Sequence, residues 1–308
     1  MVGYLFPGQG AQYVGMGKDI YEKFPATRWL FHKAEEILKF DLKKVCFEGP
    51  AEELVRTENS QPAILLVSIA SKIALESVSK DELPFHPEAL AGLSLGEYSA
   101  LVCAGSISFE DAIKIVRLRG KYMEEASQIN PGKMASIIGL TEIQVKEICK
   151  ESGAELANLN CPGQIVVSGR IESINKSIEL ARIRGAKRAI LLDVSGPFHT
   201  SFMKGAGVKL GLELDKINIS SPQIPVVSNV TADYVKEPVH IKEALIQQVS
   251  CPVRWEESVR LMIGDGIRTF FEIGPGKVLK GLVRRIDPDV EVYNVGTSED
   301  IEEVRKIC

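Results

Sequence analysis

The chain contains 308 residues, of which 45% are hydrophobic and 25% are charged. This is the composition of an ordinary globular protein, and it excludes a disordered chain, a coiled coil and a collagen-like fibre. The chain has 37 basic and 41 acidic residues, so its net charge is −4. This charge does not indicate general binding to nucleic acid. We therefore expect no nucleic-acid partner.

Short apolar runs alternate with helical patterns from the N-terminus onward, which is typical of an α/β fold with a mainly parallel sheet. The predicted strands of this first part are Val2–Phe6 and Ala89–Gly92. The predicted helices are Gln61–Lys80, capped by Asn59 and Ser60 with Pro62 in the first turn, Leu95–Ala104, which stops at Gly105, and Phe109–Ala126, capped by Ser108.

In the stretch 133–194 the predicted strands and helices follow the order βαββαβ, which is the ferredoxin-like pattern. Its predicted elements are Met134–Gly139, Thr141–Ser152, Glu155–Asn160, Gln164–Gly169, Ser173–Gly185 and Lys187–Val194. Strands of parallel character then resume at Ile224–Ser228, Thr269–Ile273 and Val290–Val295. We predict a large α/β-hydrolase-like domain with a mainly parallel sheet, formed by residues 1–128 and 197–308, and a small ferredoxin-like domain of residues 129–196 inserted into it.

The sequence does not indicate a signal peptide, a membrane-spanning segment, a metal site or a disulfide framework. No basic leader precedes Pro7, and the most apolar run, Ala63–Ala70, is far shorter than a membrane span. The six cysteines contain no CxxC pair, so a zinc or iron–sulfur site is not indicated, and a disulfide framework is implausible at this size. We expect a cytoplasmic protein with no membrane partner and no metal.

The segment Gly92-Leu93-Ser94-Leu95-Gly96 fits the pattern G-x-S-x-G between a predicted strand and a predicted helix. Glycines flank the serine because side chains would clash in so tight a turn. The turn exposes the Ser94 hydroxyl at a helix N-terminus, where the dipole and free N–H groups favour a developing negative charge. Ser94 is therefore the candidate nucleophile, and a glycine-rich turn with an inert serine is the alternative.

A serine nucleophile needs a base, and the chain offers four histidines. His32 lies in a charged helical stretch, His86 lies in a loop, and His240 precedes a polar helix. His199 follows a predicted apolar strand and a glycine–proline turn, at the kind of strand end where α/β proteins place their chemistry. His199 is the best base available to Ser94.

Arg119 lies on the apolar stripe of the predicted helix Phe109–Ala126, seven residues after Ala112. A guanidinium on a buried face needs an anionic partner. That partner is either an internal Asp or Glu, or the carboxylate of a substrate that the guanidinium binds through two parallel hydrogen bonds.

Two further glycine-rich loops follow predicted strands: Pro7-Gly8-Gln9-Gly10 and Gly274-Pro275-Gly276. Their backbone N–H groups can approach a ligand closely, and an ordinary strand-to-helix loop is the alternative. Neither loop matches the P-loop or the G-x-G-x-x-G pattern, so a nucleoside triphosphate or NAD is not indicated.

Seven segments together resemble, in the same order, the malonyl-CoA:acyl carrier protein transacylase family of bacterial fatty acid synthesis. They are FPGQGAQ, GLSLGEYSALVCAG, RLRGKYM, NCPGQIVVSG, SGPFHTSFM, PVVSN and EIGPGKVL, and the resemblance covers nearly the whole chain. It implies a ping-pong acyl transfer in which Ser94 takes the malonyl group from malonyl-CoA, with His199 as base. The phosphopantetheine thiol of the carrier protein then takes the group from Ser94. Coenzyme A enters as part of a substrate, and no cofactor is implied.

The resemblance also implies roles for residues that their own patterns do not reveal. The backbone N–H groups of Gln9 and Leu95 would hold the oxyanion, and the main-chain carbonyl of Gln248 would orient His199. Arg119 would clamp the malonyl carboxylate without needing an internal partner. The positions that match the lining of the family's substrate cleft are Gln61, Asn158, Asn160 and Gln164.

Leu93 departs from the family pattern, which usually has histidine directly before the nucleophile. We expect an altered rate or pH dependence rather than lost function, because Ser94, His199 and Arg119 all remain. Phe198 agrees with the malonyl type, since methylmalonyl-selective relatives usually carry serine there.

An acyl carrier protein is the partner that the resemblance implies, and because such carriers are acidic, their docking patch should be basic. Two clusters qualify: Arg182, Arg184, Lys187 and Arg188, and a second group of Lys280, Arg284 and Arg285. Either cluster can also be an ordinary solvated face. We expect the enzyme to be a monomer.

Two other function classes stay open. A serine thioesterase or esterase would use the same Ser94 pattern, but α/β-hydrolases place an acid between the serine and a histidine near the chain end. Here about 110 residues follow His199, and no acid stands out between it and Ser94. A non-enzymatic scaffold for carrier proteins would need neither residue.

Overall fold

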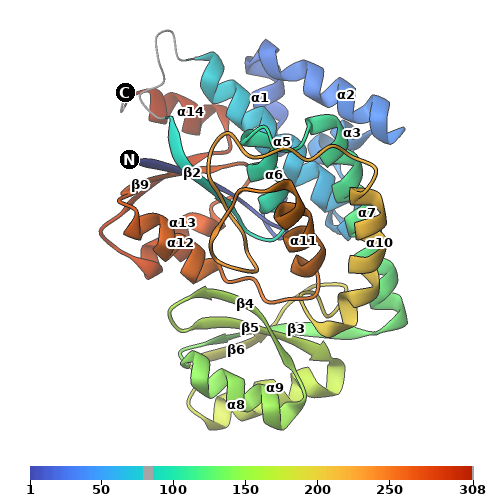
Figure 1. Ribbon diagram of the computed structural model, residues 1–308, viewed down its shortest axis with the longest axis vertical. Helices are drawn as coiled ribbons and strands as arrows, with labels where there is room; N and C mark the ends of the chain where they lie inside the picture. The colour runs from blue at the N-terminus through green and yellow to red at the C-terminus, as the bar shows by residue number, and fades with distance from the viewer. Residues whose placement is uncertain (79–85, 307–308) are drawn as a thin grey trace.

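Two β-sheets organise the chain (Figure 1). The computed structural model describes residues 1–78 and 86–306. A six-stranded sheet has the order β10-β9-β1-β2-β7-β8, and a four-stranded sheet has the order β4-β5-β3-β6. The larger sheet is built from both ends of the chain, and the smaller one from its middle. This is the expected architecture of a large α/β unit that carries an inserted ferredoxin-like unit.

The strands of the large sheet are β1 (Val2–Phe6), β2 (Pro87–Gly92), β7 (Val226–Val227), β8 (Tyr234–Val235), β9 (Thr269–Ile273) and β10 (Glu291–Val295). The helices before the insertion are α1 (Lys18–Lys23), the 3-10 turn η1 (Pro25–Thr27), α2 (Arg28–Leu38), α3 (Leu42–Glu48), α4 (Ala51–Val55), α5 (Thr57–Ser77), α6 (Gly96–Cys103) and α7 (Phe109–Ile129). Those after it are the 3-10 turn η2 (Ser201–Met203), α10 (Lys204–Leu214), α11 (Pro238–Gln248), α12 (Trp255–Gly264), α13 (Val278–Ile286) and α14 (Ser298–Arg305).

The large sheet is parallel except where β7 meets β8. Strand β1 has the sequence VGYLF and is buried along its whole length, as expected of a central parallel strand covered by helices on both faces. The loops that follow β1 and β2 leave the same edge of the sheet, and the Leu93 N–H donates to the Phe6 carbonyl at 3.0 Å. The first glycine-rich loop and the candidate nucleophile are thereby brought together.

The inserted unit has the predicted βαββαβ order. Its elements are β3 (Gly132–Ile138), α8 (Glu142–Ser152), β4 (Glu155–Cys161), β5 (Gln164–Arg170), α9 (Ile171–Ile183) and β6 (Arg188–Leu191). All its strand pairs are antiparallel, and α8 and α9 cover the face of the sheet that points away from the large sheet (Figure 1). The boundary positions 128/129 and 196/197 stay predictions.

Helix α5 begins at Thr57 rather than at Gln61, so Pro62 lies inside the helix instead of in its first turn. The predicted caps were wrong because the backbone, not a side chain, starts this helix. The N–H groups of Asn59 and Ser60 both donate to the Arg56 carbonyl, at 2.9 and 2.8 Å. The end predicted at Lys80 lies outside the described residues.

Strands β6, β7 and β8 also differ from their predictions, and the bounds of several other elements shift by one to three residues. Strand β6 ends at Leu191 rather than at Val194, because it pairs only with Ala135–Ile138 of β3. Strand β7 shrinks to two residues, and the antiparallel strand β8 was not predicted, because two-residue strands carry no periodic signal. No helix in the described part of the chain combines the length and apolarity needed to cross a bilayer.

Main-chain bonds join the two sheet units. Asn158 of β4 forms a parallel bridge with Val253, in the segment between α11 and α12. The Leu159 N–H donates to the Val253 carbonyl, and the Val253 N–H donates to the Ala157 carbonyl, both at 2.8 Å. Strand β4 is therefore fixed against the large unit by backbone bonds, in addition to the side-chain contacts of Glu155 with Ser201 and of Cys161 with the core around Trp255.

Candidate active site

A sharp turn between β2 and α6 presents Ser94, as the pattern predicts. Ser94 has a φ of 51°, in the left-handed region that non-glycine residues rarely adopt. The flanking glycines are required by contact distances. A Cβ atom on Gly92 would lie 1.9 Å from the carbonyl carbon of Gly96, and one on Gly96 would lie 2.1 Å from the Phe6 carbonyl oxygen. The turn can therefore form only with glycine at both positions.

Replacing Gly92 with alanine is expected to lower the free energy of unfolding by roughly 3 kcal/mol, because the added methyl group must displace backbone on α6. Gly281 is a matched control, since it lies in α13 and a methyl group added there would meet no neighbouring atom within 4 Å. Gly281→Ala should raise stability by about 0.5–1 kcal/mol. Chemical denaturation measures both, and equal effects of the two substitutions would contradict this account of the turn.

His199 lies against Ser94 and is held from behind by a main-chain carbonyl. Its Nε2 is 2.8 Å from Ser94 Oγ, and its Nδ1 is 2.8 Å from the carbonyl oxygen of Gln248. A carbonyl oxygen can only accept, so Nδ1 carries the proton and Nε2 is the free acceptor. The Ser94 hydroxyl therefore donates to Nε2, which is the arrangement that a general base requires.

Burial lowers the pKa of His199 to about 4, and the nearby charge of Arg119 acts in the same direction. The hydrogen bond to the Gln248 carbonyl opposes this shift only in part. The imidazole is therefore neutral at neutral pH and free to take a proton.

An NMR titration should show the His199 ring changing protonation with a midpoint near pH 4. Because the folded-state pKa lies below the ordinary value of 6.5, the associated stability is present above that value and is lost as the pH falls toward 4. Replacing Arg119 with methionine should raise the midpoint, since it removes the neighbouring positive charge. A wild-type midpoint at or above 6.5 would contradict the buried, neutral imidazole.

Arg119 of α7 is 1% exposed and points at the nucleophile, as its place on the apolar stripe suggests. Its Nη2 donates to Ser94 Oγ at 3.0 Å and to Gln248 Oε1 at 2.9 Å, and its Nη1 donates to Gln61 Oε1 at 2.7 Å. Burial lowers the pKa of Arg119, but from so high a starting value the guanidinium stays charged. No carboxylate of the described residues lies within ion-pair distance of it, so its direct partners are all neutral.

Gln61 differs from its predicted place. It was expected to line the substrate cleft, but its side chain is fully buried behind Arg119 and does not reach the cleft surface. The reason is that the first turns of α5 pack against α7, so that the amide supports the guanidinium from the side away from the cleft.

A cleft of about 530 Å³ runs between the two sheet units and contains Ser94, His199 and Arg119 in its wall. Of the other predicted cleft residues, the structure places Asn158, Asn160 and Gln164 in the lining, and Gln9, which was predicted for the oxyanion hole, also lies there. Leu93 also lines the cleft, so an apolar side chain stands where the family usually has histidine. Leu95 is fully buried at the start of α6, which leaves only its backbone N–H as a contributor.

Asn229 and Glu97 were missed by the sequence analysis. Asn229 Oδ1 accepts from the Ser94 N–H at 2.6 Å, and its Nδ2 donates to the Gly92 carbonyl at 2.7 Å. The Glu97 carboxylate accepts from the Asn229 N–H at 3.1 Å and from Gln248 Nε2 at 2.6 Å. Glu97 was detectable in principle, because it is the one charged residue of the predicted helix Leu95–Ala104.

No group of three or more metal-ligating side chains occurs among residues 1–78 and 86–306. The chemistry that the cleft can perform with its own residues is attack by an activated hydroxyl beside a fixed positive charge.

The known proteins that this chain resembles are acyl-transferring enzymes, which agrees with an activated serine in the cleft. A family model described as "Acyl transferase domain" matches residues 3–295. The malonyl CoA-acyl carrier protein transacylase of Bacillus subtilis is 48% identical over 306 residues, which are 98% of this chain and 95% of that protein.

Solved structures extend the likeness to the whole fold. An acyl-carrier-protein-S-malonyltransferase from Bartonella henselae has a TM-score of 0.95 at 40% identity, covering 99% of this chain and 98% of that one. A structure described as a type II PKS acyl-carrier protein in complex with its malonyl-transacylase gives a TM-score of 0.94 at 39% identity. The match covers 100% of this chain and 99% of that one. The chain therefore belongs to the acyl transferase family and is an acyltransferase.

Proposed function

We propose that this enzyme transfers a malonyl group from malonyl-CoA to the phosphopantetheine thiol of an acyl carrier protein, supplying fatty acid synthesis. The proposal is supported by the names of its relatives, which are a malonyl CoA-acyl carrier protein transacylase, an acyl-carrier-protein-S-malonyltransferase and a malonyl-transacylase. The observation that carries it is the Arg119 guanidinium, which is buried, charged and 3.0 Å from Ser94 Oγ, and which has no carboxylate partner within residues 1–78 and 86–306. A free carboxylate at the far end of a short acyl group would neutralise that charge.

In the first half-reaction, Ser94 Oγ attacks the thioester carbonyl carbon while its proton passes to His199 Nε2. The backbone N–H groups of Gln9 and Leu95 hold the resulting oxyanion, and the carboxylate of the malonyl group binds Arg119. Collapse of the intermediate breaks the carbon–sulfur bond, and the proton on Nε2 passes to the leaving thiolate of coenzyme A. The product is a malonyl ester of Ser94.

The second half-reaction reverses these steps with a different thiol. The carrier's phosphopantetheine sulfur attacks the malonyl ester as its proton passes to His199, and Ser94 Oγ leaves with that proton. Asn158, Asn160 and Gln164, which line the cleft, are suited to hydrogen-bond the amide groups of the pantetheine arm. The cycle needs no cofactor beyond the coenzyme A thioester that it consumes.

Incubation with malonyl-CoA, with and without a thiol acceptor, tests this function. A transferase releases one equivalent of coenzyme A and then stops as the malonyl-enzyme, which intact mass spectrometry detects, until a carrier protein is added. Continuous release of coenzyme A without any acceptor would instead indicate a thioesterase. The structure gives no support to that alternative, since the group that orients His199 is a carbonyl and not a carboxylate.

Residues from both of the basic clusters predicted for carrier docking line one groove in the fold. Lys187 and Arg188 from the first cluster and Arg285 from the second line one groove of about 540 Å³, together with Gln164. Gln164 also lines the catalytic cleft, so the groove adjoins the entrance to Ser94.

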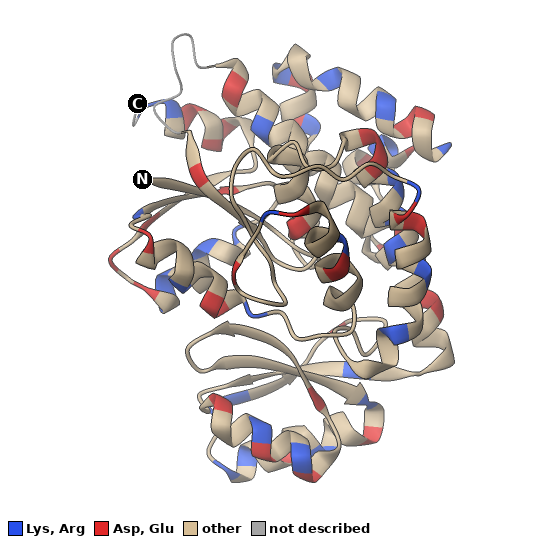
Figure 2. Cartoon of the chain, in the orientation of Figure 1, with Lys and Arg blue, Asp and Glu red and all other residues tan. Residues whose placement is uncertain are grey.

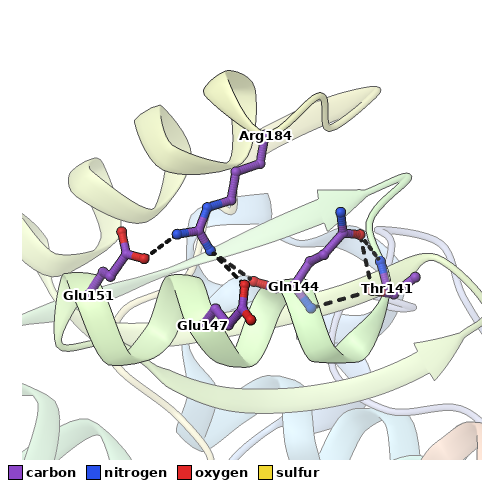
Figure 3. A network of polar contacts seen from close by, with 5 residues as sticks. All are labelled: Thr141, Gln144, Glu147, Glu151 and Arg184. Carbon is purple, nitrogen blue, oxygen red and sulfur yellow. Dashed lines mark hydrogen bonds and ion pairs between the residues drawn. The ribbon is translucent and has the colours of Figure 1, made fainter.

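The other basic residues are less available to a carrier. Arg184 reaches across to α8, where it forms ion pairs with Glu147 and Glu151 and donates to the Gln144 carbonyl (Figure 3). Basic and acidic residues lie side by side along α8 and α9, so this face has no uniform positive charge (Figure 2). Lys280 and Arg284 line a separate hollow that they share with Glu291. We therefore assign docking of the acidic carrier to the Lys187–Arg188–Arg285 groove.

The double substitution Lys187→Glu/Arg188→Glu should raise the KM for the carrier protein about tenfold, because it reverses two charges at the docking groove. The KM for malonyl-CoA in the acylation half-reaction should not change. Arg182→Glu is the matched control, since Arg182 is exposed on α9 outside the groove. An equal effect of the two variants on the carrier KM would argue against this docking site.

Three finer statements accompany the proposal. Phe198 lines the cleft beside His199 and supports selectivity for malonyl over methylmalonyl groups. The monomeric state and the cytoplasmic location stay predictions from the sequence.

A further inference from the structure

A buried carboxylate that the proposed reaction does not use lies directly behind the nucleophile. Glu97 is on the first turn of α6, and only 1% of its surface is exposed. Burial raises the pKa of this carboxyl to about 7, although hydrogen bonds from Asn229 and Gln248 and the charge of Arg119 act against the shift. A buried carboxyl group is costly unless its hydrogen bonds are satisfied, so its contacts indicate what it does there.

The first contact of Glu97 fixes the side-chain amide of Gln248. Oε2 of Glu97 accepts from Gln248 Nε2 at 2.6 Å. The same Nε2 donates to the Ser94 carbonyl at 2.9 Å, and the amide oxygen accepts from Arg119 Nη2 at 2.9 Å. If the amide were turned over, its oxygen would face the Glu97 carboxylate and its NH₂ group would face the guanidinium. Glu97, together with the Ser94 carbonyl, therefore favours the orientation in which the amide oxygen points at Arg119.

Gln248 also carries the backbone carbonyl that accepts from His199 Nδ1 at 2.8 Å. It is the last residue of α11 and is fully buried. One residue thus contacts Ser94, Arg119 and His199, and Glu97 holds its side chain in place.

The second contact of Glu97 supports the strained turn. Its Oε2 accepts from the backbone N–H of Asn229 at 3.1 Å. The Asn229 side chain spans the turn from the Gly92 carbonyl, at 2.7 Å, to the Ser94 N–H, at 2.6 Å. Because Ser94 has a φ of 51°, the turn needs external hydrogen bonds to keep that conformation.

We propose that Glu97 is the positioning residue of this active site: a single carboxylate oxygen holds Gln248 and Asn229, and through them aligns Arg119, His199 and Ser94. The proposal rests on the proposed function, in which these three residues act on the substrate. Glu97 itself does not line the cleft.

The test compares two conservative substitutions at position 97. Glu97→Asp keeps the charge but draws the carboxylate back by about 1.5 Å, the length of one carbon–carbon bond. It should slow malonylation of Ser94 on the order of 10²-fold, since misplacement by about 1 Å has this effect on an aligned site. Glu97→Gln keeps an acceptor oxygen at the original distance and should acylate at nearly the wild-type rate. Rapid quenching followed by intact mass spectrometry measures both rates.

Asp300 provides the matched control. It is also a buried carboxyl that accepts two backbone N–H groups, from Gly296 at 3.2 Å and Thr297 at 3.0 Å, but it lies at the start of α14. Asp300→Asn should leave the acylation rate unchanged. If Glu97→Asp does not fold, Gln248→Met removes the same link from the other side and should slow acylation to a similar degree.

A second measurement does not depend on the substrate. The His199 Nδ1–H proton, bonded to the Gln248 carbonyl, should give a low-field NMR resonance in the wild-type protein and in Glu97→Gln, and should lose or shift it in Glu97→Asp. Wild-type acylation in Glu97→Asp or Gln248→Met, equally slow acylation in Glu97→Gln, or an unchanged resonance in Glu97→Asp would overturn the proposal. If the wild-type protein itself is not malonylated, the proposed function fails, and the resonance alone decides the role of Glu97.

Discussion

Replacing Arg119 with alanine is expected to slow malonyl transfer roughly 10²- to 10³-fold more than acetyl transfer. A hydrogen bond to a charged group contributes about 1.5–3 kcal/mol, and a bidentate guanidinium–carboxylate pair makes two of them. The acetyl group has no carboxylate, so it gains nothing from the guanidinium in the wild-type enzyme. Its transfer should fall only through the lost contacts of Arg119 with Ser94 and Gln248.

The measurement is the ratio of kcat/KM for malonyl-CoA to that for acetyl-CoA in both proteins. Because the contacts with Ser94 and Gln248 are shared by the two reactions, their loss cancels from this ratio. Arg119→Lys serves as the control: it keeps the positive charge but not the two parallel donors, and should give an intermediate ratio. Equal losses for the two acyl groups after Arg119→Ala would reject the carboxylate clamp.

Replacing Ser94 with alanine should remove the malonyl-enzyme completely and lower the transfer rate by about 10⁴-fold or more, since a covalent route has no substitute for its nucleophile. Intact mass spectrometry after a brief pulse of malonyl-CoA should show an adduct on the wild-type chain and none on the variant.

A control separates lost chemistry from lost structure in this experiment. Ser68 is a fully buried serine on α5 and, unlike Ser94, does not line the cleft. Ser68→Ala should still form the adduct. Transfer by Ser94→Ala at a rate near that of the wild type would mean that the chain works without a covalent intermediate, as a scaffold for carrier proteins would.

The parts of the site that could be predicted are those with a local signal. Ser94 lies in a spacing of glycines that the turn requires, and Arg119 breaks the apolar stripe of a helix, so each shows its special position within a few residues. The βαββαβ order and the central parallel strands could also be predicted, since each element is several residues long and shows either a helical period or a continuous apolar run. The role of the Gln248 carbonyl came only from resemblance, because every residue has a carbonyl group.

The parts that could not be predicted depend on contacts between distant segments. Asn229 is 135 positions from Ser94, and Gln248 is 151 positions from Glu97, so no local pattern joins them. Gln61 was misplaced for the same reason: whether an amide faces a cleft or the back of an arginine is decided by how α5 packs on α7. Short strands such as β8 could not be predicted for a different reason: two residues are too few to show a hydrophobic period.

The backbone bonds between β4 and Val253 affect how the substrate cleft can change. They help to hold the wall that carries Asn158 and Asn160 at a set spacing from the nucleophile through main-chain groups. These bonds do not depend on the side chains of Asn158 and Asn160, so those two positions can change, and with them the shape of pantetheine arm that fits, while the wall keeps its place. In such a scaffold, substrate range can diverge during evolution without rebuilding the catalytic geometry.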